Sequence, residues 1–305
     1  MARLGGDIPV RQGHWSNYPF TVCRRFGAGR GADLRFTSDL PSAAGLSSSS
    51  ALVVGTYLAL ADVNEVAWAS AEELAEYLGA VESGVGTHGG SEDHTAMLCA
   101  RSGSLVQFSY APIRYERSVP LPEGWVFVVA VSGVVAAKTQ NALTAYNNVA
   151  ARAREALALL GRGTLADASP DEFRGVLRDH PSLLGRVEQF HAECEIVRAA
   201  GDALSRGDLE TLGTLVDRSQ ENAERWLANQ TQETIALART ARELGAIAAS
   251  AFGAGFGGSV YALVRAADVE EFASRWRESY LHAFPGRAES AHFFHTRAGP
   301  PASRI

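Results

Sequence analysis

The order of apolar and polar positions along the chain predicts an α/β beginning, a helical middle and an α/β end. Residues 33–39 alternate apolar and polar side chains, which predicts a strand. A Gly/Ser-rich stretch follows, and helical spacing resumes over 51–63. A second helix is expected over 71–84, because its apolar residues share one face and its glutamates occupy the first turns. The remaining expected strands are 104–109, 113–119, 125–131, 259–264 and 290–296.

From residue 139 to about residue 244 the pattern is helical almost throughout. Helices are expected at 139–161, 171–179, 184–201, 208–228 and 232–244, with a last one at 267–281. This order indicates an α+β protein of two abutting domains, residues 1–130 and residues 131–305.

Composition and charge exclude several classes of function. Hydrophobic residues make up 46% of the 305 positions and charged residues 20%, which is typical of a folded globular protein. The net charge of −6, without a basic block, gives no support for nucleic-acid or membrane partners. The three cysteines, Cys23, Cys99 and Cys194, are too far apart for a CxxC motif. We therefore expect a cytoplasmic protein with no membrane span and no signal peptide.

The strongest local signal is the stretch PSAAGLSSSSA at 41–51, between an expected strand and an expected helix. The first N–H groups of a helix lack partners and carry the positive end of its dipole, so they can hold a phosphate. The four serines add hydroxyl groups for phosphate oxygens or Mg²⁺. An ordinary serine N-cap is the plain alternative. The loop is not a Walker A motif, because it has no Gly-Lys-Ser/Thr.

Two acids, Glu82 and Asp93, flank a glycine-dense segment. Carboxylates bind Mg²⁺ and can take a proton from a hydroxyl that accepts a phosphoryl group. Isolated carboxylates are commonplace on surfaces, so this pair gains weight only beside the serine loop.

A further glycine-rich stretch, GAGFGG at 253–258, formally matches GxGxxG. It precedes an expected strand instead of a helix, which excludes a dinucleotide-binding turn. Such a turn lets two backbones, or a backbone and a phosphate, come close. The eight histidines, among them His88, His94, His292 and His295, show no metal-ligand spacing and are expected to be structural or on the surface.

These segments, in this order and spacing, resemble the GHMP kinase superfamily and, within it, the galactokinase branch. GLSSSSA at 45–51 resembles its ATP phosphate-binding motif, and FGAGFGGSVYALV at 252–264 resembles its third signature motif. HWSNY at 14–18 and AYNNVAARAREAL at 145–157 resemble two segments of galactokinases. The resemblance implies an N-terminal domain like the second domain of ribosomal protein S5 and a ferredoxin-like C-terminal domain.

The resemblance also implies roles for individual residues. Asp93 corresponds to the catalytic aspartate, and Ser49 and Glu82 correspond to the Mg²⁺ ligands. Gly90, Asp93 and Tyr146 match positions that contact the sugar. The residues expected to bind ATP are Gly45, Leu46, Ser47, Ser48, Ser49, Ser50, Trp15, Gly255 and Gly257.

The chain departs from the galactokinase pattern in several places. It has no match to the segment Gly-Arg-(x)-Asn-(x)-Ile-Gly-Glu-His-Thr-Asp-Tyr and is expected to be N-terminally shortened, leaving an apolar sheet face or edge exposed. That segment carries the arginine that faces the transferred phosphate, for which Lys138 or Arg101 are the candidate replacements. Residues 91–94, SEDH, stand in place of Ile-Met-Asp-Gln, and Val149 stands where the branch usually has Arg.

The resemblance implies an ATP-dependent kinase that phosphorylates the anomeric hydroxyl of a monosaccharide. Galactose is the first candidate, followed by arabinose and N-acetylgalactosamine. Two alternatives stay open: a non-catalytic sugar- or nucleotide-binding regulatory relative, motivated by the missing segment, and a kinase of the superfamily acting on another small alcohol such as mevalonate or homoserine. The sequence leaves the oligomeric state open.

Overall fold

A computed structural model gives the fold and describes residues 4–6, 8–11, 13–41, 43–86, 89–135 and 141–304, with the backbone alone for 141–146. The chain forms two compact units. Unit 1 comprises Met1–Ser42, Leu46–Ser118 and Ala298–Ile305. Unit 2 comprises Ala43–Gly45 and Val119–Arg297.

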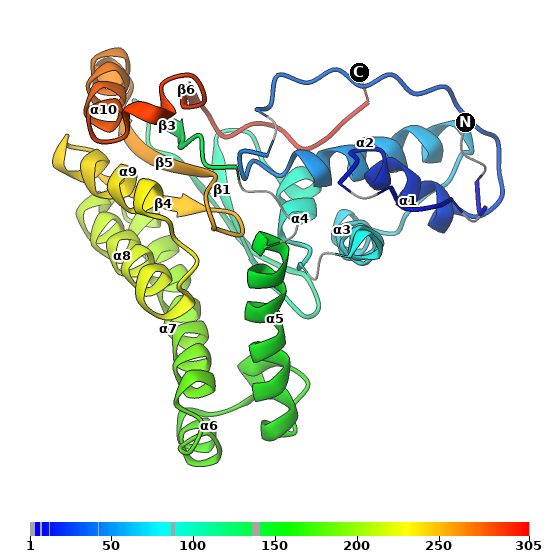
Figure 1. Ribbon diagram of the computed structural model, residues 1–305, viewed down its shortest axis with the longest axis horizontal. Helices are drawn as coiled ribbons and strands as arrows, with labels where there is room; N and C mark the ends of the chain where they lie inside the picture. Colours follow the sequence, from blue (N-terminus) through cyan, green and yellow to red (C-terminus); the bar gives the residue numbers. More distant parts are fainter. Residues whose placement is uncertain are drawn as a thin grey trace. The chain divides into compact units, whose positions relative to one another are not determined.

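Unit 1 is a cluster of four helices with one small sheet (Figure 1). Its core gathers apolar residues of the first three helices, among them Val22, Val53, Leu60 and Leu78. The third helix begins where Ser70 accepts a hydrogen bond from the N–H of Glu73, as a helix-capping serine does. The helices and strands are α1 (Asn17–Phe26), α2 (Ser48–Val63), α3 (Ala71–Glu82), the 3₁₀ turn Ser83–Val85, α4 (Glu92–Cys99), β1 (Ser104–Ser109) and β2 (Arg114–Pro120).

The strand expected at 33–39 is wrong, because these residues form no regular structure. The alternation of apolar and polar residues is present, but a strand also needs a neighbour for its N–H and C=O groups. In the described chain no strand pairs with this stretch, and its side chains are almost all exposed. The sheet of unit 1 has only the paired strands β1 and β2 among the described residues, and Leu105 and Tyr115 on them are exposed.

Unit 2 is built on a four-stranded antiparallel sheet of order β4-β5-β3-β6 (Figure 1). Successive side chains of a strand point to opposite faces, and β3 and β5 are apolar on both. Val126, Val128 and Ala130 of β3 belong to the core covered by α9 (Gln232–Glu243) and α10 (Val269–Ala283). Trp125 and Phe127 of the same strand pack against the core on α7 (Pro181–Ser205) and α8 (Leu209–Asn222). The strands are β3 (Trp125–Val131), β4 (Ala248–Phe252), β5 (Ser259–Arg265) and β6 (His292–Thr296).

A helical arm extends from this sheet. In Figure 1, α5 and α7 lie side by side and meet α6 at their far ends. Their apolar faces form a core of their own, with Phe173, Leu177 and Val187 buried in it. The helices of unit 2 are α5 (Asn141–Leu160), α6 (Pro170–Val176), α7 (Pro181–Ser205), α8 (Leu209–Asn222), α9 (Gln232–Glu243) and α10 (Val269–Ala283). Shorter turns are Leu165–Asp167, the π-helix Ala223–Leu227, Ala266–Asp268 and Pro285–Arg287.

Candidate active site

The serine loop leads directly into α2. Ser47 precedes the helix with a left-handed backbone (φ 54°), and its side chain makes no capping hydrogen bond. The ordinary N-cap interpretation is therefore wrong for Ser47. The N–H groups of the first helical turn, from Ser48 on, lack intrahelical partners by the geometry of any helix. The loop thus keeps the features of an anion-binding helix start, within unit 1 from Leu46 onward.

Three side chains predicted to act together meet in unit 1. Ser50, on the first turn of α2, is buried, and its hydroxyl donates to Oε2 of Glu82 over 2.7 Å. Its Oγ also lies 3.4 Å from Oδ2 of Asp93. Glu82 is the last residue of α3, and Asp93 lies in the first turn of α4. The fold therefore joins both predicted carboxylates through one serine hydroxyl.

A histidine that the sequence analysis left without a role belongs to this cluster. Nε2 of His94 lies 3.0 Å from Oε2 of Glu82, and both side chains are buried. The ring is not aligned for a hydrogen bond with this oxygen. Within the described part of the chain, Nδ1 of His94 is also buried and has no hydrogen-bond partner. The only signal in the sequence was its position beside Asp93.

Ser49, the predicted Mg²⁺ ligand, lies beside Tyr18 of α1. Burial, and after it the negative charge of Glu82, raise the pKa of Tyr18, and a hydrogen bond with the Ser49 side chain partly offsets this rise. Tyr18 therefore stays a neutral phenol at neutral pH. Ser49 and Ser50 thus have different surroundings, since Ser49 contacts the phenol and Ser50 contacts the carboxylates.

The donor set of this cluster is suited to Mg²⁺. Glu82, Asp93 and the serine hydroxyls all offer hard oxygen atoms, which Mg²⁺ prefers. Among the described residues, no group of three or more His, Cys, Asp or Glu side chains is placed to hold a metal ion. Mg²⁺ in phosphoryl-transfer sites is commonly held by one or two carboxylates together with substrate phosphates, so the residues present fit it.

The other predicted residues of unit 1 lie in varied settings. Trp15 is half-exposed, stacks on His14 and meets Phe36 edge-on. Gly90 is exposed, with open space where a Cβ would be. Arg101 donates to the hydroxyl of Tyr115 and lies over its ring. The side chain of Tyr146 and the whole of Lys138 lie outside the described residues.

In unit 2 the glycine turn 253–258 is packed against other backbone segments. A Cβ on Gly253 would lie 2.9 Å from the carbonyl oxygen of Gly45, and one on Gly257 would lie 2.8 Å from that of Val134. A Cβ on Gly255 would collide with the carbonyl oxygen of Asn229. These glycines also have positive φ, which side chains rarely tolerate. Close backbone approach alone thus accounts for Gly255 and Gly257, and their predicted contact with nucleotide stays a prediction.

The loop Ala43–Gly45 is fixed to this turn. The buried hydroxyl of Ser259 donates to the carbonyl oxygen of Ala44 over 2.7 Å. Ser132, after β3, binds the carbonyl oxygen of Gly258 through both its N–H and its hydroxyl. The glycine turn therefore connects the end of β3, the start of β5 and the residues just before the serines.

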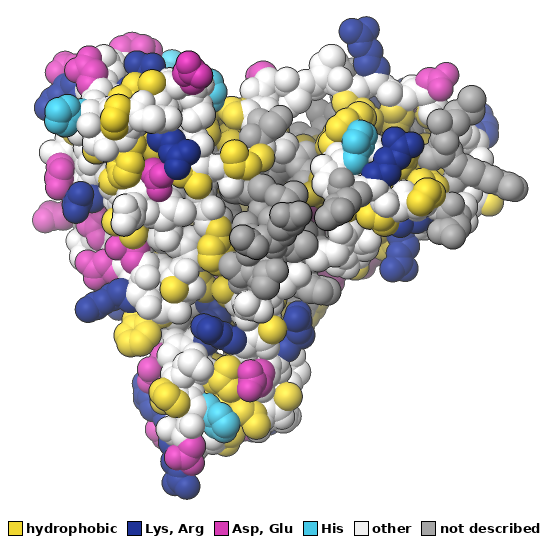
Figure 2. Space-filling view, in the orientation of Figure 1, with side chains coloured by type: hydrophobic (Ala, Val, Ile, Leu, Met, Phe, Trp, Pro, Cys, Tyr) yellow, Lys and Arg dark blue, Asp and Glu magenta, His cyan; other side chains and the backbone are white. Residues whose placement is uncertain are grey.

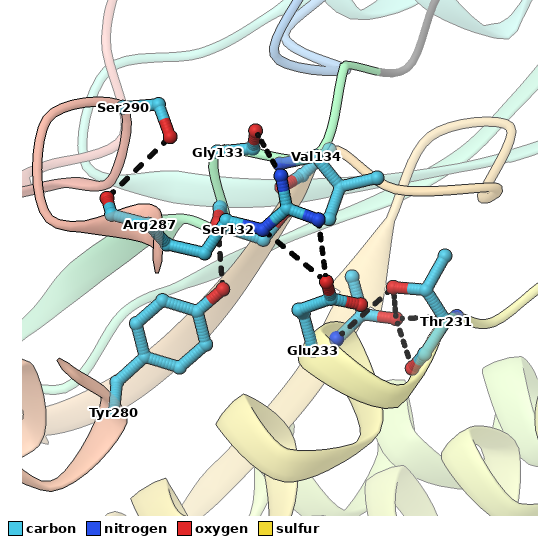
Figure 3. A network of polar contacts seen from close by, with 10 residues as sticks. Ser132, Gly133, Val134, Thr231, Glu233, Tyr280, Arg287 and Ser290 are labelled. Carbon is cyan, nitrogen blue, oxygen red and sulfur yellow. Dashed lines mark hydrogen bonds and ion pairs between the residues drawn. The ribbon is translucent and has the colours of Figure 1, made fainter. Parts of the chain in front are cut away.

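A polar network holds the end of β3 (Figure 3). The hydroxyl of Tyr280 donates to the carbonyl oxygen of Ser132 over 2.6 Å, and Nη2 of Arg287 lies 2.7 Å from Glu233. Burial, and then the charge of Glu233, raise the pKa of Tyr280, which keeps this donor protonated. Partial burial raises the pKa of Glu233, but the hydrogen bonds from Arg287 and the backbone outweigh it, so its pKa is lowered.

The charged side chains on one face of the described chain follow no single pattern. Figure 2 shows basic and acidic side chains interspersed on the visible face of the described chain, without a continuous basic patch. Over the described residues, every helix is too short or too polar to cross a bilayer.

Comparisons with known proteins identify the family of this chain. The family model of the GHMP kinase N-terminal domain matches residues 17–101, and that of the GHMP kinase C-terminal domain matches residues 202–282. A galactokinase of Chloroflexus aggregans is 32% identical over 285 residues, covering 88% of this chain and 71% of the relative. A galactokinase of Thermococcus kodakarensis is 30% identical, with 84% and 71% covered.

Solved structures give the same result. The crystal structure of Lactococcus lactis galactokinase, complexed with galactose, matches with a TM-score of 0.83 at 25% identity, over 97% of this chain and 78% of that one. A homoserine kinase from Cytophaga hutchinsonii matches with a TM-score of 0.57 at 16% identity, over 96% and 79%, which bears on the fold alone. The chain therefore belongs to the GHMP kinase family, on its galactokinase-like side, and is a sugar kinase, a phosphotransferase with an alcohol group as acceptor.

Proposed function

We propose that this chain transfers the terminal phosphoryl group of ATP to the anomeric hydroxyl of a monosaccharide, with galactose as the first candidate. The observation that carries the proposal is the buried contact of Ser50 with both Glu82 and Asp93 at the start of α2. The similarity to galactokinases supports the choice of a hexose acceptor.

Different groups of the chain would bind the phosphates, accept the proton and hold the metal. The serine hydroxyls of residues 47–50 and the first N–H groups of α2 bind and orient the phosphates. Asp93 accepts the proton of the sugar O1 hydroxyl as that oxygen attacks phosphorus, so the carboxylate becomes neutral while the bond to ADP breaks. Ser49 and Glu82 would hold Mg²⁺, which when bound neutralises charge on the transferred phosphate. Trp15 would contact the adenine, and Gly90 and Tyr146 would contact the sugar.

The test is an ADP-release assay with ATP, Mg²⁺ and a panel of galactose, N-acetylgalactosamine, arabinose, glucose, mevalonate and homoserine. We expect release that depends on galactose and a product phosphorylated at O1, identified by ³¹P NMR. Asp93→Asn should lower kcat by at least about 100-fold and keep ATP affinity, since it removes only the proton acceptor.

Other results of this assay would identify one of the alternative functions. Release with mevalonate or homoserine alone would contradict the sugar and identify a kinase of another small alcohol. Binding of ATP or sugar by calorimetry, without release for any acceptor, would identify a non-catalytic relative. Full activity of Asp93→Asn would remove Asp93 from the mechanism.

A further inference from the structure

His94 is the buried group of the site for which the proposed function has no use. Its side chain is 2% exposed and lies beside the Glu82 carboxylate. Burying an imidazole costs free energy unless its polar atoms are compensated, and Nδ1 has no partner. A leucine would fill the same space without this cost. The presence of a polar ring at this position therefore needs a functional explanation.

The geometry around Glu82 supplies one. Oε2 of Glu82 lies 2.7 Å from the Ser50 hydroxyl and 3.0 Å from Nε2 of His94. The two groups come from different helices, α2 and α4, so together they hold the carboxylate at the end of α3 from two directions. Polar partners stabilise a buried carboxylate, because an uncompensated charge in the interior costs free energy.

We propose that His94 is a positioning residue that holds Oε2 of Glu82 against Ser50 and thereby fixes the carboxylate that would bind the metal of a metal–nucleotide complex. The inference rests on the proposed function for the identity of that ligand. It assigns consecutive residues of α4 to two tasks, since Asp93 faces Ser50 and His94 faces Glu82. Groups that orient a metal ligand typically change metal affinity by 10–100-fold when they are removed.

The first experiment needs neither metal nor nucleotide. Long-range ¹H–¹⁵N NMR of the histidine rings compares the wild type with Glu82→Gln, and His94→Gln assigns the resonance. The ring signals of His94 should shift in Glu82→Gln, whereas those of His191, which stacks on Phe173 in unit 2, should not. Unchanged His94 signals in a folded Glu82→Gln protein would overturn the inference.

The second experiment measures metal binding directly. The affinity for Mn²⁺, in the presence of a non-hydrolysable ATP analogue, is followed by electron paramagnetic resonance for wild type, His94→Leu and His94→Gln. His94→Leu should weaken Mn²⁺ binding about 10-fold or more. His94→Gln, whose side-chain amide is polar and can approach Oε2, should recover affinity to within about 3-fold of wild type. A His94→Leu protein with wild-type affinity, or a His94→Gln protein as weak as His94→Leu, would contradict the positioning role.

A double-variant cycle separates this role from mere support of the fold. If His94 acts through Glu82, adding His94→Leu to Glu82→Gln should weaken Mn²⁺ binding no further. An additional 10-fold loss would mean that His94 acts by another route. His191→Gln is the matched control and should keep wild-type affinity. Wild-type protein that shows these metal effects but phosphorylates no sugar would support the inference while overturning the proposed function.

Discussion

The hydroxyl of Ser259 donates to the carbonyl oxygen of Ala44, which joins the first residue of β5 to the loop before the serines. Both residues are buried and both belong to unit 2, although they are 215 positions apart in the chain. The bond fixes the segment that leads into the serine loop.

Ser259→Ala should leave the Ala44 carbonyl buried without this donor. Such an unsatisfied group costs about 1–3 kcal/mol, so the free energy of unfolding should fall by that amount. Urea titration followed by circular dichroism measures it. Ser274→Ala, on the exposed side of α10, is the control and should change stability by less than about 0.5 kcal/mol. Equal stabilities of the two variants would show that the bond contributes nothing.

Ser50→Ala removes the hydroxyl that both carboxylates share. The buried Glu82 then loses the hydrogen bond from Ser50, and we expect a loss of about 1–3 kcal/mol in the free energy of unfolding. Turnover of sugar should fall as well, because the carboxylate is no longer held. Ser48→Ala, two residues earlier in the same helical turn and only half-buried, should unfold with nearly wild-type stability. A stable Ser50→Ala protein would mean that the carboxylates do not depend on this hydroxyl.

Gly255→Ala should destabilise unit 2 strongly. Gly255 has φ of 78°, and a Cβ there would collide with the carbonyl oxygen of Asn229. Gly103→Ala is matched in backbone conformation, with φ of 71° and open space around its Cβ, so it carries only the conformational cost of about 1–2 kcal/mol. In thermal unfolding, the free energy of unfolding of Gly255→Ala should be at least about 2 kcal/mol lower than that of Gly103→Ala. Similar free energies of unfolding for the two variants would show that the turn shifts to accommodate a methyl group.

The pair of Glu233 and Arg287 should make stability depend on acid pH. The pKa of Glu233 is lower in the folded chain than its ordinary value, so the pair stabilises the fold above that ordinary value, near pH 4.5. The contribution is lost as the pH falls through the folded pKa, because the carboxylate is then protonated. Melting temperatures of wild type and Glu233→Gln should differ most near neutral pH and converge below about pH 4. A difference that does not depend on pH would exclude this charge effect.

Much of the fold could be predicted from local patterns, and the exceptions have a common cause. The apolar run 125–131 is β3 as expected, since a strand covered on both faces needs apolar residues throughout. β4 was missed because its sequence, AASAF, has little strand preference and forms a strand by pairing with β5. The helix expected at 208–228 ends as α8 at Asn222, and a π-helical turn follows it. Whether these residues form a strand or a helix depends on pairing and packing partners that lie far away in the sequence.

Two short helices were missed although signals for them existed. α4 has Glu92 and Asp93 in its first turn, which favours a helix start. The glycines just before it concealed this signal. α1 carries Pro19 within its first turn, where proline is tolerated.

The candidate site divides in the same way. Glu82, Asp93 and the serines were found because their residue types and motif resemble a family. The roles of Tyr18 and His94 could not be found, since their contacts with Ser49 and Glu82 depend on how α1 and α4 pack in unit 1. The proposed role of His94 is tested by the experiments described above, and the predicted nucleotide contacts of Gly255 and Gly257 stay predictions.

The glycine turn also limits which genetic changes can repair a damaged chain. The atoms that a side chain on Gly253, Gly255 or Gly258 would meet first are carbonyl oxygens of other segments. A second mutation alters side chains and leaves those oxygens in place. A selection for revertants of Gly255→Ala should therefore return the glycine codon itself or stabilising changes elsewhere, and no compensating substitution at Asn229.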